Sequence, residues 1–333
     1  MIHTKRFASQ LMYGVPQGSV LGPVLFVLYT TPLSDIIANH SVNHQLFADD
    51  TQIQKSAPLS EMTNLTKELN ACRDDIKTWM TENQLKLNDD KTETLLFPFS
   101  SSLKPSTVSL PDSIILGPHN IPFSDFARNL GFILDSKLST KKHVIKIGQT
   151  AYFELKRICS IRRFLTEGAT KTLVTSYIFS RLDYCNCLLM GTPNSVIQPL
   201  QKIQNFAVRL LLLAPRHHHS TTLLEKLHWL PISERIKYKV ACMCFSATSG
   251  SGPAYLSELL HVYTPSRTLR SSSDTRMLEI QQYKLKTHGF HTFSCFGPHI
   301  WNSLPQDLRH CSTLSSFKAK LKTFLFSQYF HPN

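Results

Sequence analysis

The clearest pattern in the chain is a helical spacing of apolar residues between Leu59 and Trp79. Apolar residues recur there in steps of three or four, at positions 59, 62, 65, 69, 72, 76 and 79. Residues with this spacing share one face of an α-helix. The pattern therefore predicts an amphipathic helix that buries this face and ends near Asn83.

Two elements are predicted before this helix. Residues 14–23, Gly-Val-Pro-Gln-Gly-Ser-Val-Leu-Gly-Pro, precede an apolar run from Val24 to Tyr29. Such a density of glycine and proline indicates a tight loop, here one that leads into a helix. Around residues 44–54, short apolar pieces flank an Asp-Asp pair, which predicts two strands joined by a turn.

Behind the helix, the sequence predicts a second pair of strands at residues 85–88 and 93–99. Asn-Asp-Asp at positions 88–90 supplies turn chemistry between them. The Ser/Pro-rich stretch from Ser100 to Ser113 predicts a loop or a weak hairpin.

Beyond Asp135 the patterns become helical. Apolar positions between His143 and Leu165 predict a long basic helix. Further helices are predicted at residues 169–190, 196–213, 233–248 and 315–326. The fold class is therefore α+β, with antiparallel strands and helices in residues 1–135, a helical region at 136–250 and a C-terminal region at 251–333.

Charge separates the same regions. The chain of 333 residues has a formal charge of +13, with a net −4 in residues 1–135 and a net +17 in residues 136–333. An excess of this size favours a polyanionic partner. No apolar run suits a signal peptide or a membrane span, so we expect an intracellular protein without a membrane partner.

The Asp49-Asp50 pair is the first candidate for chemistry. On a regular strand, adjacent side chains point to opposite faces, so both carboxylates can serve one site only at a turn. Two carboxylates placed together repel each other unless a divalent cation such as Mg²⁺ lies beside them. The alternative is a solvated turn, for which Asp is well suited.

The glycine-rich segment adds to this interpretation. Gly14, Gly18 and Gly22 allow close approach of the backbone to a ligand, and the Gln17 amide can both donate and accept hydrogen bonds. The following helix N-terminus favours phosphate. Together with Phe47-Ala48-Asp49-Asp50, this segment closely resembles two palm motifs of the reverse transcriptases of non-LTR (LINE-type) retrotransposons.

Further segments agree with that family. Trp79 to Asn83, followed by Lys91-Thr92-Glu93, resembles the helix and loop behind the catalytic hairpin, and residues 130–135 resemble the strand pair near the primer end. Later segments are similar to the region behind the palm in CR1/L2-like LINE elements; they include residues 180–186, 227–232, 265–267 and 301–305.

The resemblance implies an RNA-directed DNA polymerase that adds nucleotides to the 3′ end of a DNA primer on an RNA template. Residues 1–135 would be a partial palm, residues 136–250 a thumb-like region and residues 251–333 the C-terminal region of a LINE-type polyprotein. Mg²⁺ or Mn²⁺ would be the cofactor, with Asp49 and Asp50 as catalytic residues and metal ligands. Lys91 would lie near the leaving pyrophosphate, although an exposed turn lysine is an equally good interpretation. The pocket for the template base and the incoming nucleotide would be shaped by Gly14, Gln17, Gly18, Ser19, Phe47 and Ala48.

One carboxylate of the family pattern has no counterpart here. In the family, a metal-binding Asp lies on a strand well before the glycine-rich loop, whereas the first acidic residue of this chain is Asp35. We therefore expect an N-terminal truncation within the palm and little or no polymerase activity from the chain alone. A non-catalytic, nucleic-acid-binding remnant is the alternative, and a structural or partner-binding protein is a third hypothesis.

The basic region is the candidate nucleic-acid interface. Its helices would contact the phosphate backbone of an RNA–DNA hybrid without reading its sequence. Solvated helix faces are the alternative, but acidic partners are scarce here. The candidate residues are Lys141, Lys142, Lys146, Lys156, Arg157, Arg162 and Arg163.

Overall fold

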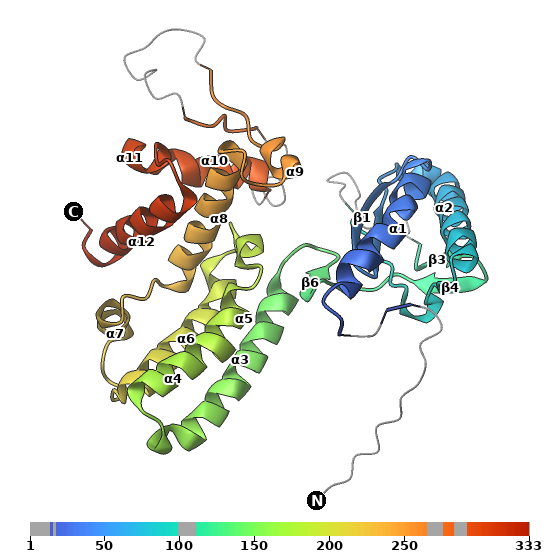
Figure 1. Ribbon diagram of the computed structural model, residues 1–333. Coiled ribbons are helices and arrows are strands. Elements are labelled where there is room, and N and C mark those ends of the chain that lie inside the picture. The colour runs from blue at the N-terminus through green and yellow to red at the C-terminus, as the bar shows by residue number, and fades with distance from the viewer. Residues whose placement is uncertain (1–13, 16–17, 99–110, 265–275, 283–291, 333) are drawn as a thin grey trace, which may run out of the picture. The chain divides into compact units, whose positions relative to one another are not determined.

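The computed structural model describes residues 14–15, 18–98, 111–264, 276–282 and 292–332 (Figure 1). The chain divides into two compact units, Met1–Asp125 and Phe126–Asn333. This division precedes residue 135, where the sequence analysis sets its first boundary. Each unit has a hydrophobic core of its own.

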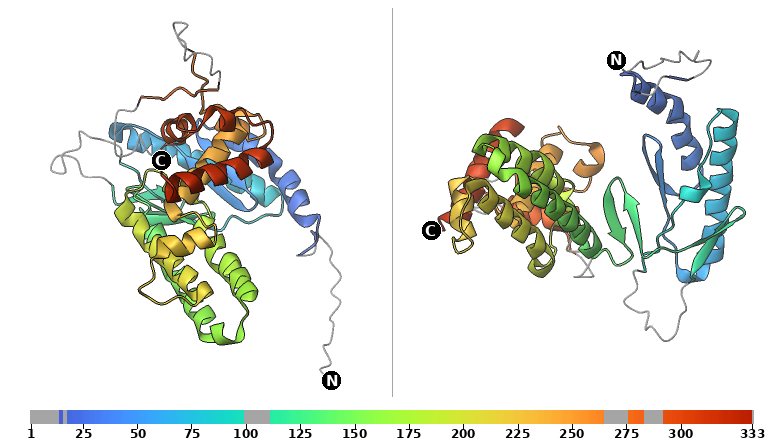
Figure 2. Two further views of the ribbon diagram at one scale, coloured as in Figure 1. Left: turned by 90° about the vertical axis from the view of Figure 1, so that its left-hand side faces the viewer. Right: turned by 90° about the horizontal axis from the view of Figure 1, so that it is seen from below.

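The first unit combines two helices with a β-hairpin. Strands β1 (Asn43–Phe47) and β2 (Asp50–Gln54) pair antiparallel, and helices α1 (Gly22–Ala38) and α2 (Met62–Glu82) lie beside them (Figures 1 and 2). A 3₁₀ turn, η1 (Leu59–Glu61), leads into α2. The predicted hairpin and both predicted helices are thus confirmed.

The core of this unit follows from the helical spacing. Leu33 and Ile37 of α1 are buried against Cys72 and Ile76 of α2. Around them pack the partly buried side chains of Val42, Leu46, Ile53, Trp79 and Met80. The Tyr29 hydroxyl donates a hydrogen bond to the Asn83 carbonyl (2.7 Å), which ties α1 to the end of α2.

The first half of α1 is also apolar on its outer side. Val24 and Leu28 are exposed, as are Val20 and Leu21 just before the helix.

The second pair of strands predicted in this unit is wrong. Residues 85–88 form no strand, Asp89–Lys91 form a 3₁₀ turn (η2), and Thr94 makes an isolated bridge to Phe123. The structure instead contains a hairpin that the sequence patterns do not indicate. In it, β3 (Ser113–Leu116) pairs with β4 (His119–Pro122). Most of the predicted Ser100–Ser113 loop lies outside the described residues.

An ionic cluster fixes η2 beside α2. The Arg73 guanidinium donates to the Asp89 carboxylate (2.7 Å), while Lys77 Nζ and His119 Nε2 lie 3.8 and 4.0 Å from it. The hydrogen bond from Arg73 and the nearby positive charges hold the pKa of Asp89 below its usual value. This cluster explains why residues 89–91 close a turn against the helix instead of joining two strands.

The β3–β4 turn docks on the same helix. The Gly117 N–H donates to Asn70 Oδ1 (2.6 Å), and Asn70 Nδ2 donates to the Ile115 carbonyl (2.8 Å). Gly117 has φ = +59°, and a Cβ there would lie 2.3 Å from Nη1 of the Arg73 guanidinium, whose Nη2 donates to Asp89. The position therefore requires glycine for both backbone conformation and space.

The second unit begins with a hairpin and continues as packed helices. Strands β5 (Phe126–Asn129) and β6 (Phe132–Asp135) pair antiparallel, close to the predicted strand pair at residues 130–135. Helices α3, α4 and α6 lie side by side (Figure 1). The helices up to residue 248 are α3 (Lys141–Ile161), α4 (Glu167–Val174), α5 (Ser180–Asp183), α6 (Asn194–Leu212), α7 (Ser220–Lys226) and α8 (Ile232–Thr248).

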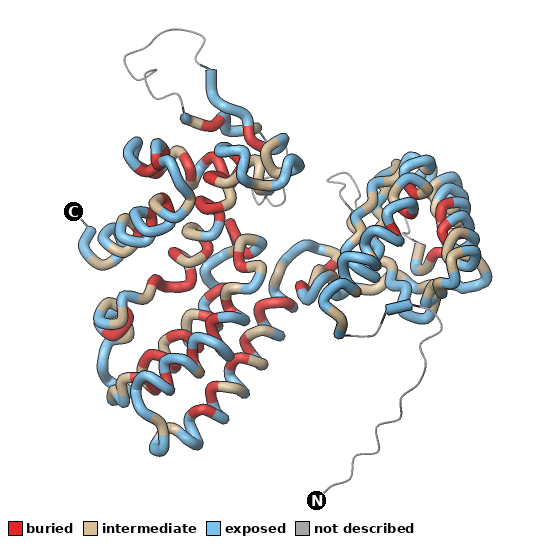
Figure 3. Tube along the Cα trace, in the orientation of Figure 1, coloured by how far each residue is buried: buried red, intermediate tan, exposed pale blue. Residues whose placement is uncertain are grey.

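The predicted helix at residues 169–190 ends early. A π-helical turn, η4 (Thr175–Phe179), joins α4 to α5, and the helix stops at Asp183. Tyr184 is extended and Cys185 has φ = +52°, so the chain turns into a 3₁₀ segment, η5 (Asn186–Leu189). Buried residues of these segments, among them Val174, Ile178 and Leu182, belong to the core of the second unit, and Figure 3 colours buried positions red.

The C-terminal helices complete the same core. They are α9 (Ala254–Ser257), α10 (Phe293–Asn302), α11 (Gln306–Arg309) and α12 (Leu314–Phe330). Trp301 is buried against Phe245 and Phe317, and its indole N–H donates to the Arg276 carbonyl (2.6 Å). The predicted helix at residues 315–326 is confirmed and extends to Phe330.

The described residues form three two-stranded antiparallel sheets together with many helices, which agrees with the predicted α+β class. Within the described residues, no helix has both the length and the apolar composition needed to cross a bilayer.

Replacing Gly117 by Ala is expected to destabilise the first unit by about 1–2 kcal/mol, because a side chain at this positive φ is strained. Urea unfolding followed by circular dichroism measures the change. Gly168→Ala is the control, because Gly168 lies in α4 with open space around it and without a positive φ, so Ala is expected to be neutral or stabilising there. Equal effects of the two substitutions would contradict this account.

The Asp89 cluster predicts an acid-sensitive contribution to stability. Because the folded pKa lies below the unfolded value of about 4, the contribution is present above that value and is lost as pH falls through the folded pKa. The difference in unfolding free energy between wild type and Asp89→Asn should therefore shrink below about pH 4. Asp90→Asn, at an exposed neighbour outside the cluster, is the matched control.

Candidate functional site

Asp49 and Asp50 lie at the tip of the β1–β2 hairpin. Phe47 pairs with Asp50, so Ala48 and Asp49 form a two-residue turn, and Ala48 adopts the left-handed φ of +53°. A positive φ suits so short a loop because its twist matches that of the two strands. Both carboxylates are exposed, and neither forms an ion pair among the described residues.

A cavity of about 220 Å³ lies beside this turn. Its apolar part comes from α1, β1 and the end of α2, and its charged residues are Asp49 and Lys86. The lining residues are Phe26, Thr30, Leu33, Leu46, Ala48, Asp49, Thr51, Met80, Leu85 and Lys86. The cavity therefore pairs a carboxylate with an ammonium group over an apolar floor.

Lys86 is the member of this site that the sequence analysis missed. It lies in a segment predicted to be a strand, and no spacing pattern connects it with the hairpin. The segment reaches the cavity because α2 ends at Glu82 and the chain then turns at Gln84, whose φ is +57°.

Lys91 is exposed in η2, next to the Asp89 cluster, and it does not line the cavity. Its predicted role at the leaving pyrophosphate stays a prediction.

The glycine-rich segment is described in part. Gly14 and Gly18 have φ of +81° and +87° with open space at the Cβ position, so their backbone is accessible. The Gly22 N–H donates to the Ser19 hydroxyl (2.9 Å), which satisfies a free amide at the start of α1. Gln17 lies outside the described residues.

The donor set at the hairpin fits one divalent cation better than two. Mg²⁺ in proteins is often held by one or two carboxylates together with substrate phosphates and water. Asp49 and Asp50 supply two carboxylates of this kind. A pair of ions about 3.5–4 Å apart needs more converging ligands. Among the described residues, no group of three His, Cys, Asp or Glu side chains comes together to supply them.

Six of the seven predicted nucleic-acid contacts are exposed on one region of the second unit. They are Lys141, Lys142, Lys146, Lys156 and Arg157 of α3 and Arg163 just beyond it. Of these, Arg157 is paired with Glu154 (3.2 Å) on the same helix. The remaining side chains are available for phosphate contacts.

Arg162 differs from the other six. Its guanidinium donates to the backbone carbonyls of Leu165 (2.7 Å), Leu210 (3.0 Å) and Leu211 (3.0 Å). It thereby satisfies free carbonyls at the end of α6. Its donors hold the helices together, so we leave Arg162 out of the interface proposed below.

The β5–β6 hairpin is fixed to the start of α3. The Asp135 carboxylate accepts hydrogen bonds from the Lys137 N–H (3.0 Å), the Ser139 N–H (2.9 Å) and the Ser139 hydroxyl (2.6 Å). Burial raises the pKa of Asp135, but these hydrogen bonds outweigh burial, and the pKa lies below its usual value. At the other end of the hairpin, the Tyr184 hydroxyl donates to the Leu130 carbonyl.

His143 also connects the β5–β6 hairpin to α3. Its Nδ1 accepts from the Ile133 N–H (3.2 Å), and its ring lies 3.8 Å from the ring of Phe132. Burial lowers the pKa of His143 to about 4, so the ring is neutral at physiological pH. The residue therefore acts as a packed hydrogen-bond acceptor.

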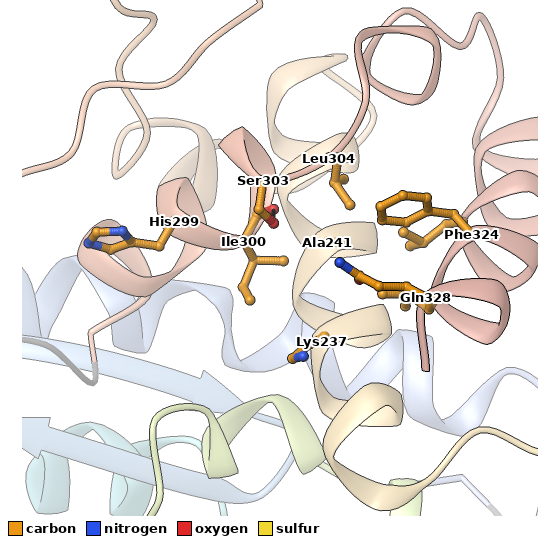
Figure 4. A pocket seen from close by; sticks show the side chains of 10 residues that line it. Lys237, Ala241, His299, Ile300, Ser303, Leu304, Phe324 and Gln328 are labelled. Carbon is orange, nitrogen blue, oxygen red and sulfur yellow. Dashed lines mark hydrogen bonds between the residues drawn. The ribbon is translucent and has the colours of Figure 1, made fainter. Parts of the chain in front are cut away.

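A second cavity, of about 320 Å³, lies between α8, α10 and α12 of the second unit (Figure 4). Its walls are mainly apolar, with Ile300, Leu304 and Phe324 among them. The Lys237 ammonium at its edge donates to the Glu234 carboxylate (2.8 Å), so its charge is already paired. This cavity carries none of the motif residues.

Comparison with known proteins connects the hairpin with a family. Residues 3–143 match the family described as "Reverse transcriptase (RNA-dependent DNA polymerase)". This range contains the glycine-rich segment, both carboxylates and the cavity beside them. No solved structure matches the chain significantly.

The relatives are polymerases of mobile elements. The chain is 27% identical over 239 residues to "Probable RNA-directed DNA polymerase from transposon BS" of Drosophila melanogaster, which covers 67% of this chain and 25% of that protein. It is 26% identical over 229 residues to the corresponding protein "from transposon X-element" (67% and 24%) and 28% identical over 153 residues to that "from mobile element jockey" (44% and 15%), both from the same fly.

The chain spans about a quarter of the length of the first two of these relatives. The family match over residues 3–143 and the likeness to transposon polymerases point to the same kind of protein. Residues 3–143 thus match the reverse transcriptase family, and the chain is similar to RNA-directed DNA polymerases of transposons, which supports the LINE-type resemblance of its motifs.

Proposed function

We propose that the chain is part of an RNA-directed DNA polymerase that extends a DNA primer on an RNA template. The observation that carries the proposal is the two-carboxylate turn of the β1–β2 hairpin, which opens beside a cavity within the family domain. Residues 1–135 would act as part of the palm, residues 136–250 as the thumb-like region and residues 251–333 as the C-terminal region of the polyprotein.

The residues beside the turn would have distinct roles. Asp49 and Asp50 would hold Mg²⁺ or Mn²⁺, which lowers the repulsion between the carboxylates and nucleotide phosphates. The Lys86 ammonium, which lines the same cavity as Asp49, would neutralise phosphate charge. The open backbone at Gly14 and Gly18 would allow a nucleotide or template base to approach closely.

The second unit would hold the primer–template duplex. Lys141, Lys142, Lys146 and Lys156 are exposed along α3, and residues 136–166 contain a single acidic residue, Glu154. Such a surface contacts phosphates without reading base sequence.

The chain alone is expected to catalyse no primer extension. Two-metal nucleotidyl transfer requires more ligands than the two carboxylates of one hairpin, and the described residues bring no third acidic side chain to them. Primer extension on an RNA template by the purified chain, with Mg²⁺ or Mn²⁺, tests this statement. Extension that Asp49→Asn abolishes would overturn it.

Metal binding at the turn is expected even without turnover. Asp49→Asn and Asp50→Asn should each weaken Mn²⁺ binding by on the order of tenfold or more, because a charged oxygen ligand is lost. Electron paramagnetic resonance of free Mn²⁺ measures the affinity. Asp90→Asn removes an exposed carboxylate elsewhere in the same unit and should change little. An equal loss in all three variants would show that binding is diffuse.

Binding of an RNA–DNA hybrid should depend steeply on salt. The logarithm of the affinity is expected to fall linearly with the logarithm of salt concentration, and Lys146→Gln and Lys156→Gln should each reduce the slope by about one. Fluorescence anisotropy at several salt concentrations measures it. Lys322→Gln, at an exposed lysine of α12, is the matched control. A response that is flat with salt would contradict the proposed interface.

A further inference from the structure

Exposed aromatic rings accompany the basic residues of α3 and its neighbours. Tyr152, Phe153 and Phe164 are 46%, 61% and 73% exposed, and Phe126 on β5 is 51% exposed. Each ring has a cation above it: Lys142 Nζ lies 4.3 Å from the centre of the Phe126 ring, Lys156 Nζ 5.0 Å from Tyr152, Arg157 Cζ 6.0 Å from Phe153 and Arg163 Cζ 4.6 Å from Phe164. We call these four pairs the aromatic–basic strip.

The helical part of the strip lies on one side of α3. Steps of three or four residues link Gln149, Tyr152, Phe153, Lys156 and Arg157, and all five are exposed. The opposite side of the helix is buried in the bundle (Figure 3), through Val144, Ala151, Leu155 and Ile158. With 21 residues, α3 is about 32 Å long, so the strip extends over several nucleotides.

The arrangement is suited to a ligand with both charge and flat apolar faces. A cation over a ring leaves part of that ring open to solvent, as the exposed fractions show. Nucleobases stack on such rings, while the phosphates between bases meet the lysines and arginines. In a duplex, the flat faces of the bases are already stacked on one another. An unpaired strand offers these faces.

A membrane surface is the other common partner of a basic helix with aromatic residues. Helices that lie on membranes keep an apolar face apart from a basic face. Here rings and cations alternate on the same side of α3, and the apolar side is occupied by the protein core. The pattern therefore favours a nucleic acid.

We propose that the aromatic–basic strip binds the unpaired strand that adjoins a primer–template duplex, by stacking bases on the rings of residues 126, 152, 153 and 164. The proposal rests on the proposed binding of an RNA–DNA hybrid by the second unit. It adds to the basic residues of this face four aromatic rings that bind single-stranded RNA beside the duplex.

The test compares two hybrids with the full chain. One is a blunt RNA–DNA hybrid, and the other is the same hybrid with a single-stranded RNA overhang of about ten nucleotides, within the range that such strips accommodate. The overhang is expected to raise affinity by on the order of tenfold or more, measured by fluorescence anisotropy at constant salt. Phe153→Leu and Phe164→Leu keep the charges, and each should remove most of that gain while leaving binding of the blunt hybrid unchanged.

Tyr255→Leu is the matched control, because Tyr255 is an exposed ring on α9 that lies outside the strip. Thermal unfolding of each variant verifies that the fold is kept. No gain from the overhang, or a gain that survives both Phe substitutions, would overturn the inference. If the wild-type chain does not bind the blunt hybrid at all, the proposed function would be overturned instead.

Binding to vesicles that contain phosphatidylserine tests the membrane alternative. Binding to them that is lost in Phe153→Leu and Phe164→Leu, without any gain from the overhang, would assign the strip to a membrane surface and overturn the inference.

Discussion

Packing of α1 against α2 is the interaction on which the first unit depends. Leu33, Ile37, Cys72 and Ile76 are almost completely buried, and each fully buried aliphatic side chain contributes about 1.5–3 kcal/mol. A two-stranded hairpin has little stability by itself. The β1–β2 hairpin is therefore held by the helices, and the position of Asp49 at its turn follows from their packing.

The same dependence explains the cavity beside Asp49. Its walls come from α1, from the hairpin and from the segment behind α2, which no local pattern would bring together. The Asp89 cluster and the Asn70–Gly117 contact tie that segment and the β3–β4 hairpin to α2. One helix thus organises both the apolar core and the polar contacts of the unit.

In the second unit, the corresponding element is α3. Its buried side contributes to the core, its first turn is fixed to the β5–β6 hairpin by Asp135 and His143, and its outer side carries the basic residues. The lysine and arginine side chains are therefore attached to a rigid helix, which reduces the entropy lost when they bind phosphates. Arg162 shows the limit of reading function from charge, because its guanidinium serves backbone carbonyls instead of a ligand.

Local patterns predicted much of this architecture. The spacing of apolar residues determined α2 and the long helices of the second unit, and the Asp-Asp turn between short apolar pieces determined the β1–β2 hairpin. Prediction was wrong at residues 85–99, where Asp89 binds Arg73 and Thr94 pairs with Phe123, and at the end of the 169–190 helix. At both places contacts with distant residues outweigh local preference; at the helix end, the Tyr184 hydroxyl donates to the Leu130 carbonyl.

By itself, the sequence determined which residues form helices or turns, where charge accumulates and which family the motifs resemble. These properties depend on neighbours along the chain, and for that reason spacing and composition report them. Tertiary structure alone decided that Lys86 shares a cavity with Asp49, that Lys91 does not line it and that Arg162 is engaged within the bundle. Such contacts join residues far apart in sequence, and only the packing of helices against the hairpins and against one another brings them into place.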